Sequence, residues 1–247
     1  MIALRAPNGL GDAIGLRAVV LHLLERGESV SVFTKWHDVF ADLPITINPV
    51  TENTGNEDYR YMSFPLSSAI PPGTNDFTMR CRQLGITEPV KLQLKWKVRN
   101  HALLERIKRD ARGRPIFVYQ SARTIRSYAS MLLAPRRQAF NKFVAKYHGH
   151  YRIKLGHPPH VPEDKDAPCE LDMYGKAFIL DTFDICTIAD LFFGQASFIT
   201  CMAEALDKPH ICMFARAALR STDTRANTTT PERALAKKHL ATVVYDD

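Results

Sequence analysis

The chain has 247 residues, of which 45% are hydrophobic and 24% charged, and it carries a formal net charge of +7. This composition provides enough apolar material for one large core or two smaller ones. The sequence shows no apolar run long enough to span a membrane, no signal-peptide layout and no C-x-x-C pair. We therefore expect a cytoplasmic globular protein with five reduced cysteines and no transmembrane segment.

The N-terminal pattern predicts a strand over residues 2–6, the loop run A-P-N-G-L-G-D, a helix over 13–26 and a strand over 29–34. This order opens a parallel α/β sheet, in which ligands bind beyond the carboxyl ends of the strands. Gly9 and Gly11 would let the backbone approach a ligand, and the helix amides would suit a phosphate. Asp12 is either the N-cap of the helix or a catalytic base.

Two other phosphate-binding motifs are excluded by their spacing. The glycines do not fit G-x-G-x-x-G, and no Lys-Ser/Thr pair follows them as in a P-loop. Ser197 follows a predicted strand, as the nucleophile of a hydrolase would, but lacks the glycines of G-x-S-x-G. The glycine loop alone thus indicates an α/β ligand site without naming the ligand.

Further along, residues 44–76 read as loops with short extended pieces, followed by helices over 77–84 and 98–111. Near Pro115 the α/β pattern starts again. We expect strands over 115–119, 151–155, 191–194 and a final one over 209–214, with helices ending at 147 and over 184–189 and 197–206. The restart predicts two Rossmann-like α/β domains, residues 1–113 and 114–247, facing across a cleft.

Charge is unevenly distributed along the chain. Residues 91–154 contain 17 Lys/Arg and two acids, whereas the remainder contains 16 Lys/Arg and 24 acids. Such a basic block suits a polyanionic partner, and it is equally compatible with a solvated basic face. Trp96, between two lysines of this block, could stack on a base or sugar or lie half-buried in the hinge region.

Three stretches together resemble the heptosyltransferase-like glycosyltransferases, which have the two-domain GT-B fold. They are the run Gly9-Leu10-Gly11-Asp12, the strand and loop over 117–128, and the region from Asp172 to Pro209 with its Leu-Asp-x-Pro ending. In the second stretch Arg123 keeps the first residue of an Arg-x-x-Lys-x-Trp pattern, while Arg126 replaces the lysine. The third stretch resembles the nucleotide-sugar site, but Ala196 and Cys201 stand where the family has an aspartate and a histidine.

The resemblance implies roles for individual residues. Asp12 would be the catalytic base, while Gly9 and Gly11 would let the donor approach. Arg123 and Arg126, aided by the helix start at Ser197, would hold the donor diphosphate. Glu204 would bind the ribose.

The expected function is a metal-independent glycosyltransferase without a cofactor, which moves a sugar from a nucleotide-sugar to a hydroxyl of a lipopolysaccharide-type glycan. The polyanionic acceptor is a phosphorylated glycan in this interpretation. One alternative acceptor is DNA carrying hydroxylated bases, which the basic block favours. Another alternative is a non-catalytic nucleic-acid-binding or scaffold protein on a decayed transferase fold, because the donor acid and imidazole are absent. Four histidines within residues 148–160 could bind a metal, but the run lacks a cysteine pair and is interpreted as a surface loop.

Overall fold

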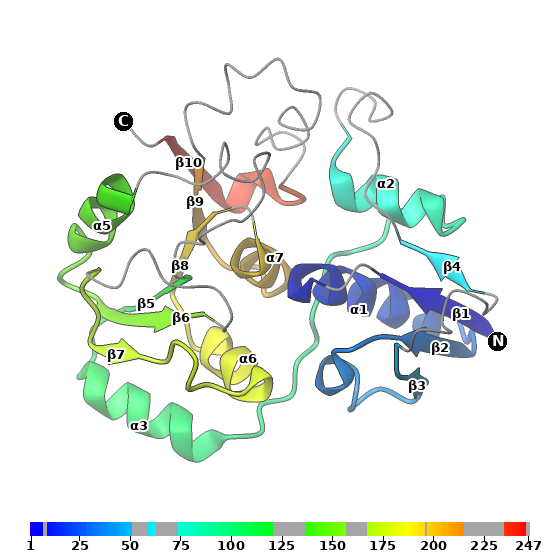
Figure 1. The fold of residues 1–247 in the computed structure, drawn as a ribbon, viewed down its shortest axis with the longest axis horizontal. Helices are drawn as coiled ribbons and strands as arrows, with labels where there is room; N and C mark the ends of the chain where they lie inside the picture. Colours follow the sequence, from blue (N-terminus) through cyan, green and yellow to red (C-terminus); the bar gives the residue numbers. More distant parts are fainter. Residues whose placement is uncertain are drawn as a thin grey trace.

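The computed structural model describes residues 1–6, 9–50, 59–62, 74–120, 137–156, 167–195, 197–214 and 235–245. In these residues the chain forms two parallel sheets, with strand orders β3-β2-β1-β4 and β10-β9-β8-β5-β6-β7 (Figure 1). The first sheet lies within residues 2–61 and the second within residues 116–245. This arrangement confirms the predicted α/β class with two Rossmann-like units.

The N-terminal unit is built around a helix that is buried on nearly all sides. Residues 13–21 of this helix are all buried, because it packs against its own sheet and against a helix of the second unit. The elements are β1 (Ile2–Arg5), α1 (Leu10–Glu25), β2 (Val30–Phe33), η1 (His37–Val39), β3 (Thr46–Asn48), β4 (Arg60–Tyr61) and α2 (Asp76–Gln83).

The C-terminal unit has strands β5 and β9 buried along their whole length, as expected for a parallel sheet covered by helices. Its elements are α3 (His101–Ala111), β5 (Ile116–Gln120), α5 (Arg137–Ala145), β6 (Tyr151–Leu155), β7 (Leu171–Asp172), α6 (Ile179–Thr187), β8 (Leu191–Gly194), α7 (Phe198–Ala205), β9 (His210–Phe214), η5 (Lys238–Leu240) and β10 (Ala241–Tyr245). None of the described helices is both long and apolar enough to cross a membrane.

Both sheets reverse their winding direction beside their first strand. In the N-terminal sheet β2 and β3 lie on one side of β1 and β4 on the other, so the reversal falls between β1 and β4. In the C-terminal sheet it falls between β5 and β8. Such switch points leave a crevice at the carboxyl ends of the strands, where ligands of open α/β sheets bind.

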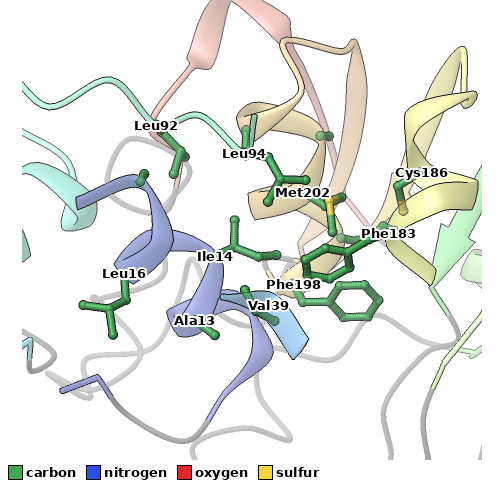
Figure 2. Packing of buried hydrophobic residues seen from close by; sticks show 14 of the residues in the cluster. Ala13, Ile14, Leu16, Val39, Leu92, Leu94, Phe183, Cys186, Phe198 and Met202 are labelled. Atoms are coloured by element: carbon green, nitrogen blue, oxygen red, sulfur yellow. The ribbon is translucent and has the colours of Figure 1, made fainter. Parts of the chain in front are cut away.

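Helices α1 and α7 join the two units through a shared hydrophobic core. Ile14 of α1 lies near Phe198 and Met202 of α7, and Leu94 covers them from the connecting segment (Figure 2). The helices approach closely because Gly11 has no side chain: a Cβ there would lie 3.3 Å from the Cys201 sulfur. Since α1 follows β1 and α7 follows β8, their contact turns the carboxyl edges of the two sheets toward each other.

The extended segment over residues 87–100 connects the two units and is held at two points. On the N-terminal side Arg17, fully buried in α1, donates hydrogen bonds to the carbonyl oxygens of Val39, Leu94 and Lys95. It also forms a two-pronged ion pair with Asp42, with N–O distances of 2.7 and 2.8 Å. The bonds to Leu94 and Lys95 fix the connecting segment to α1, and those to Val39 and Asp42 tie the chain around η1 to the same side chain.

On the C-terminal side the anchor is Asp184 of α6, which is also fully buried. Its carboxylate accepts hydrogen bonds from the Trp96 indole at 2.7 Å and from the backbone amides of Arg99 and Asn100. The Trp96 ring packs edge-on against Phe183 with 4.8 Å between centroids. Trp96 is therefore the half-buried residue of the connecting segment that one of the two sequence interpretations expected.

Several element boundaries differ from those predicted. Helix α1 begins at Leu10 with Gly9 as its N-cap, so Asp12 lies inside the first turn and the N-cap interpretation of Asp12 is wrong. Helix α3 begins only at His101, because Asp184 and the Asn100 cap hold the preceding residues in an extended form. The strand over 209–214 is not the last one, since β10 pairs with it in parallel.

The predicted boundary at residue 113 stays a prediction. Helix α3 precedes that boundary but contacts α6 of the second unit, and the Asn100 side chain donates to Asp181 at 2.9 Å. The contacts of α3 are thus made across the predicted boundary.

Candidate active site

The first turn of α1 carries the acid that the sequence singles out. Asp12 is an acidic residue at a helix N-terminus, where the partial positive charge of the helix favours it. Arg80 of α2 donates a hydrogen bond from Nη1 to Asp12 Oδ1 at 2.5 Å, and both side chains are almost buried, at 10% and 12% exposure. The second carboxylate oxygen, Oδ2, accepts no hydrogen bond from any described residue.

Arg80 bridges two carboxylates. Its Nη2 lies 3.5 Å from Asp76 Oδ2, one helical turn earlier on α2. This second contact orients the guanidinium group, so that the position of the Asp12 carboxylate depends on α2 as well as on α1. Arg80 is not recognisable from the sequence, because nothing in the pattern D-F-T-M-R-C-R-Q distinguishes it from Arg82.

Gly9 leaves the space that the Asp12 carboxylate occupies. A Cβ at position 9 would lie 2.6 Å from Asp12 Oδ2, much closer than carbon and oxygen atoms pack. The φ angle of Gly9 is −78°, an ordinary value, so a larger residue here would displace the Asp12 carboxylate and would not strain the backbone. The two glycines therefore leave room for different neighbours. Gly11 allows α7 to pack closely, and Gly9 leaves space for the Asp12 carboxylate.

The start of α7 lies at the switch point of the second sheet. Ser197 is the N-cap, and its hydroxyl is hydrogen-bonded to the side chain of Gln120, the last residue of β5. The Ser197 amide donates to the Thr200 hydroxyl at 3.0 Å. Ser197 thereby ties the beginning of α7 to the carboxyl end of β5, where the predicted donor site would lie.

Glu204 lies near the other end of α7, and its side chain is turned toward the C-terminal segment. It is 2% exposed, and its carboxylate accepts hydrogen bonds from the backbone amides of Ala236 and Lys237. Burial raises the pKa of Glu204 to about 7, although these amides act in the opposite direction. Its predicted contact with a ribose stays a prediction.

Cys201 of α7, which the resemblance aligned with a histidine, does not carry an activated thiol. Burial raises the pKa of its thiol to about 12, so it is protonated at neutral pH. All five cysteines of the chain are free, as predicted. A thiol packed against Gly11 fills the space between α1 and α7 and cannot replace the hydrogen bonds of an imidazole.

Arg123 and Arg126 lie outside the described residues, so their diphosphate contacts stay predictions, as does the contribution of His157 and His160 to a metal site. In the part of the chain that the structure describes, no three His, Cys, Asp or Glu side chains are placed to hold a metal ion.

Comparisons with protein-family models and with curated protein sequences find no match. Solved structures do match. A family 9 glycosyl transferase from Veillonella parvula superposes with a TM-score of 0.66 at 10% identity, covering 98% of this chain and 85% of that one. The ADP-heptose lipopolysaccharide heptosyltransferase II of Escherichia coli gives 0.62 at 12% identity, covering 100% and 93%. E. coli heptosyltransferase WaaC with ADP gives 0.55 at 9% identity, covering 87% and 88%.

The chain has the GT-B fold.

In the GT-B arrangement the two sheets oppose their carboxyl edges, and here the first turn of α1 packs against the start of α7. Asp12 and Ser197 belong to these two turns. The structure thus places the predicted base and the predicted donor-side helix start at the junction of the two GT-B units. It adds Arg80, from a helix that the sequence analysis left without a role.

Proposed function

We propose that the protein is a nucleotide-sugar-dependent glycosyltransferase that modifies a hydroxyl of a lipopolysaccharide-type glycan. Support comes from the GT-B fold shared with structures named heptosyltransferases. One of these structures is described with ADP and another with ADP-2-deoxy-2-fluoro heptose. Adenosine diphosphate sugars are therefore the first donors to test with this chain.

In this proposal Asp12 is the general base. Its carboxylate takes the proton of the acceptor hydroxyl as the hydroxyl oxygen bonds to the anomeric carbon of the donor sugar. The bond between that carbon and the diphosphate breaks, and the nucleoside diphosphate leaves with the electron pair. The observation that carries the proposal is the Asp12 carboxylate, which Arg80 fixes through one oxygen while the other accepts no hydrogen bond from a described residue.

Arg80 is a positioning residue in this mechanism. A base must lie within about 3 Å of the proton that it removes, so a carboxylate free to rotate would be out of place much of the time. The contact to Arg80, supported by Asp76, restricts that rotation. Gly9 contributes by leaving room for the oxygen that faces it.

The leaving group would be held from the C-terminal unit. We assign Arg123, Arg126 and the helix start at Ser197 to the diphosphate, whose negative charge grows as the glycosidic bond breaks. Glu204 is assigned to the ribose. The reaction proposed here needs no metal ion, because guanidinium groups and helix amides supply the positive charge.

The test is transfer itself. The protein is incubated with a panel of nucleotide-sugars and a truncated core oligosaccharide, and the acceptor is examined by mass spectrometry for the gain of one sugar. Binding of ADP, UDP, GDP and CMP is measured in parallel by calorimetry. Transfer supports the proposal; absence of both transfer and nucleotide binding contradicts it and favours a non-catalytic scaffold.

DNA with hydroxylated bases remains the second candidate acceptor, because of the 17 Lys/Arg and two acids in residues 91–154. The affinity for such a polyanion would depend strongly on salt. With six phosphate contacts, the affinity should fall about a thousandfold between 50 and 200 mM salt. Hydroxymethylated duplex DNA is therefore included as an acceptor. Transfer to DNA and not to the oligosaccharide would contradict the glycan acceptor and identify DNA as the acceptor instead.

A further inference from the structure

The switch point of the N-terminal sheet carries a cluster of aromatic and arginine side chains that has no role in the proposed chemistry. Arg5 is the last residue of β1 and pairs in register with Tyr61, the last residue of β4. On its other side Arg5 pairs with Phe33, the last residue of β2. Residues paired in register point to the same face of a sheet, so these three side chains form a row along its carboxyl edge.

Contacts within the row produce an aromatic surface around one cation. The Arg5 guanidinium lies 5.3 Å from the Tyr59 ring centroid and 5.8 Å from that of Tyr61, and it donates a hydrogen bond to the Tyr59 hydroxyl at 2.7 Å. Tyr59 also contacts Phe33, with 5.7 Å between centroids. These contacts hold the guanidinium and the Tyr59 ring in fixed positions.

A ligand can reach the cluster at Tyr61, and Arg5 has a hydrogen-bond donor that is not used within the described residues. Tyr61 is 44% exposed, one of three exposed large hydrophobic residues in the described ranges. The Arg5 Nε is buried and has no hydrogen-bond partner in the described part of the chain. An arginine fork binds a carboxylate or phosphate through two parallel hydrogen bonds, and an exposed ring offers an apolar face to a sugar.

The charge of the surrounding unit favours one anionic group over a polyanion. In the described residues up to 62, five Lys/Arg are matched by five Asp/Glu, and the basic block lies elsewhere in the sequence. A nucleic acid would need several phosphate contacts along a basic surface. A sugar that carries a single carboxylate or phosphate needs only one cation beside a ring.

We infer that Arg5, Tyr59 and Tyr61 form the acceptor subsite, which binds a sugar ring with one carboxylate or phosphate. The inference rests on the proposed function, in which the acceptor hydroxyl must reach Asp12. The positions agree, because β1 ends at Arg5 and leads directly into the helix that carries Asp12. Tyr61 stacks on the sugar, Arg5 pairs with its anionic group, and Tyr59 orients Arg5.

The experiment measures acceptor binding without donor or turnover. An array of immobilised oligosaccharides, some with a carboxylate or phosphate and some neutral, is probed with the full chain, alongside spots of single-stranded and duplex DNA. Tyr61→Ala and Arg5→Gln are compared with Phe178→Ala, which removes another exposed aromatic ring, 78% exposed, from the C-terminal unit. Thermal unfolding confirms that each variant is folded.

We expect the parent and Phe178→Ala to bind acidic oligosaccharides in preference to neutral ones. Tyr61→Ala should weaken this binding at least about tenfold, and Arg5→Gln should abolish the preference for acidic members. Equal binding by all variants, or binding to DNA spots alone, would overturn the subsite, as would no binding by the parent. The array contains no donor, so its result is read separately from the proposed chemistry, whether or not the protein transfers sugar.

Discussion

Asp12 and Arg17 are both charged, nearly or fully buried, and five residues apart on helix α1, yet their surroundings differ. Arg17 makes five hydrogen bonds, three to backbone carbonyls and two to Asp42. Asp12 accepts one, from Arg80, within the described residues. A charge whose hydrogen-bonding capacity is fully used holds structure together, because a ligand could bind it only by breaking existing bonds. A charge with an unused oxygen can accept a proton from a substrate.

The largest effect is expected from Asp12. Asp12→Asn keeps the shape of the side chain but removes the base, so turnover should fall about 10²–10⁴-fold while nucleotide binding and the unfolding temperature change little. Asp38→Asn, which removes another acid from a first helical turn but at an exposed position, is the matched control. Unfolding of Asp12→Asn with unchanged activity per folded molecule would assign Asp12 a structural role instead.

Arg17 should show the opposite pattern. Arg17→Met leaves Asp42 without its partner and three backbone carbonyls unsatisfied, so the free energy of unfolding should fall by about 3–5 kcal/mol. Arg26→Met, at the C-cap of α1, breaks the exposed ion pair with Glu88 and should cost less than about 1 kcal/mol. Denaturant unfolding measures both. A small loss for Arg17→Met would show that the five hydrogen bonds of Arg17 do not stabilise the fold.

Glu204 is a third buried ionisable side chain to compare with Asp12 and Arg17. Among the described residues, its carboxylate accepts hydrogen bonds from only two donors, both of them backbone amides. Burial raises its pKa from 4.5 to about 7, so the folded state retains a proton that the unfolded state has already released. Stability should therefore decrease as pH rises from about 4.5 to about 7, by up to about 3 kcal/mol.

Glu204→Gln keeps an oxygen for the amides of Ala236 and Lys237 and removes the titration. Unfolding measured from pH 4 to 8 should show the loss in the parent and not in the variant. Identical pH profiles for the two proteins would show that folding does not raise the pKa of Glu204.

The smallest of the four effects is expected at Arg80. Arg80→Met should lower kcat about 10–100-fold with little change in the KM for the donor, because the carboxylate loses its charged hydrogen bond but remains present. Arg80→Lys should recover part of that loss. Arg82→Met, an exposed arginine two residues further along α2, is the control. A loss of stability without a kcat effect, or no recovery with lysine, would contradict the positioning role.

Most of the secondary structure of the described residues could be predicted because each strand or helix carries its own periodicity. The buried strand over residues 116–120 and the glycine run before α1 are local features of the sequence. The errors are local as well. Helix α1 extends further toward the N-terminus than expected, because Gly9 serves as N-cap without a side-chain hydrogen bond. Strand β10 is not among the predicted strands, although the run A-T-V-V-Y over residues 241–245 has strand-forming residues; its pairing with β9 is a tertiary contact.

The site could be predicted only in part. The sequence alone identified the Gly9–Asp12 run as the beginning of a ligand site and, through its resemblance to known transferases, indicated the GT-B fold. Only the tertiary structure decided that Arg80, 68 residues away, is the partner of Asp12, and that Arg5 meets Tyr59 across two strands. The physical reason is that propensity and periodicity act over a few residues. The pairing of one arginine among many with one carboxylate depends instead on the packing of whole helices and on strand order, which no short pattern encodes.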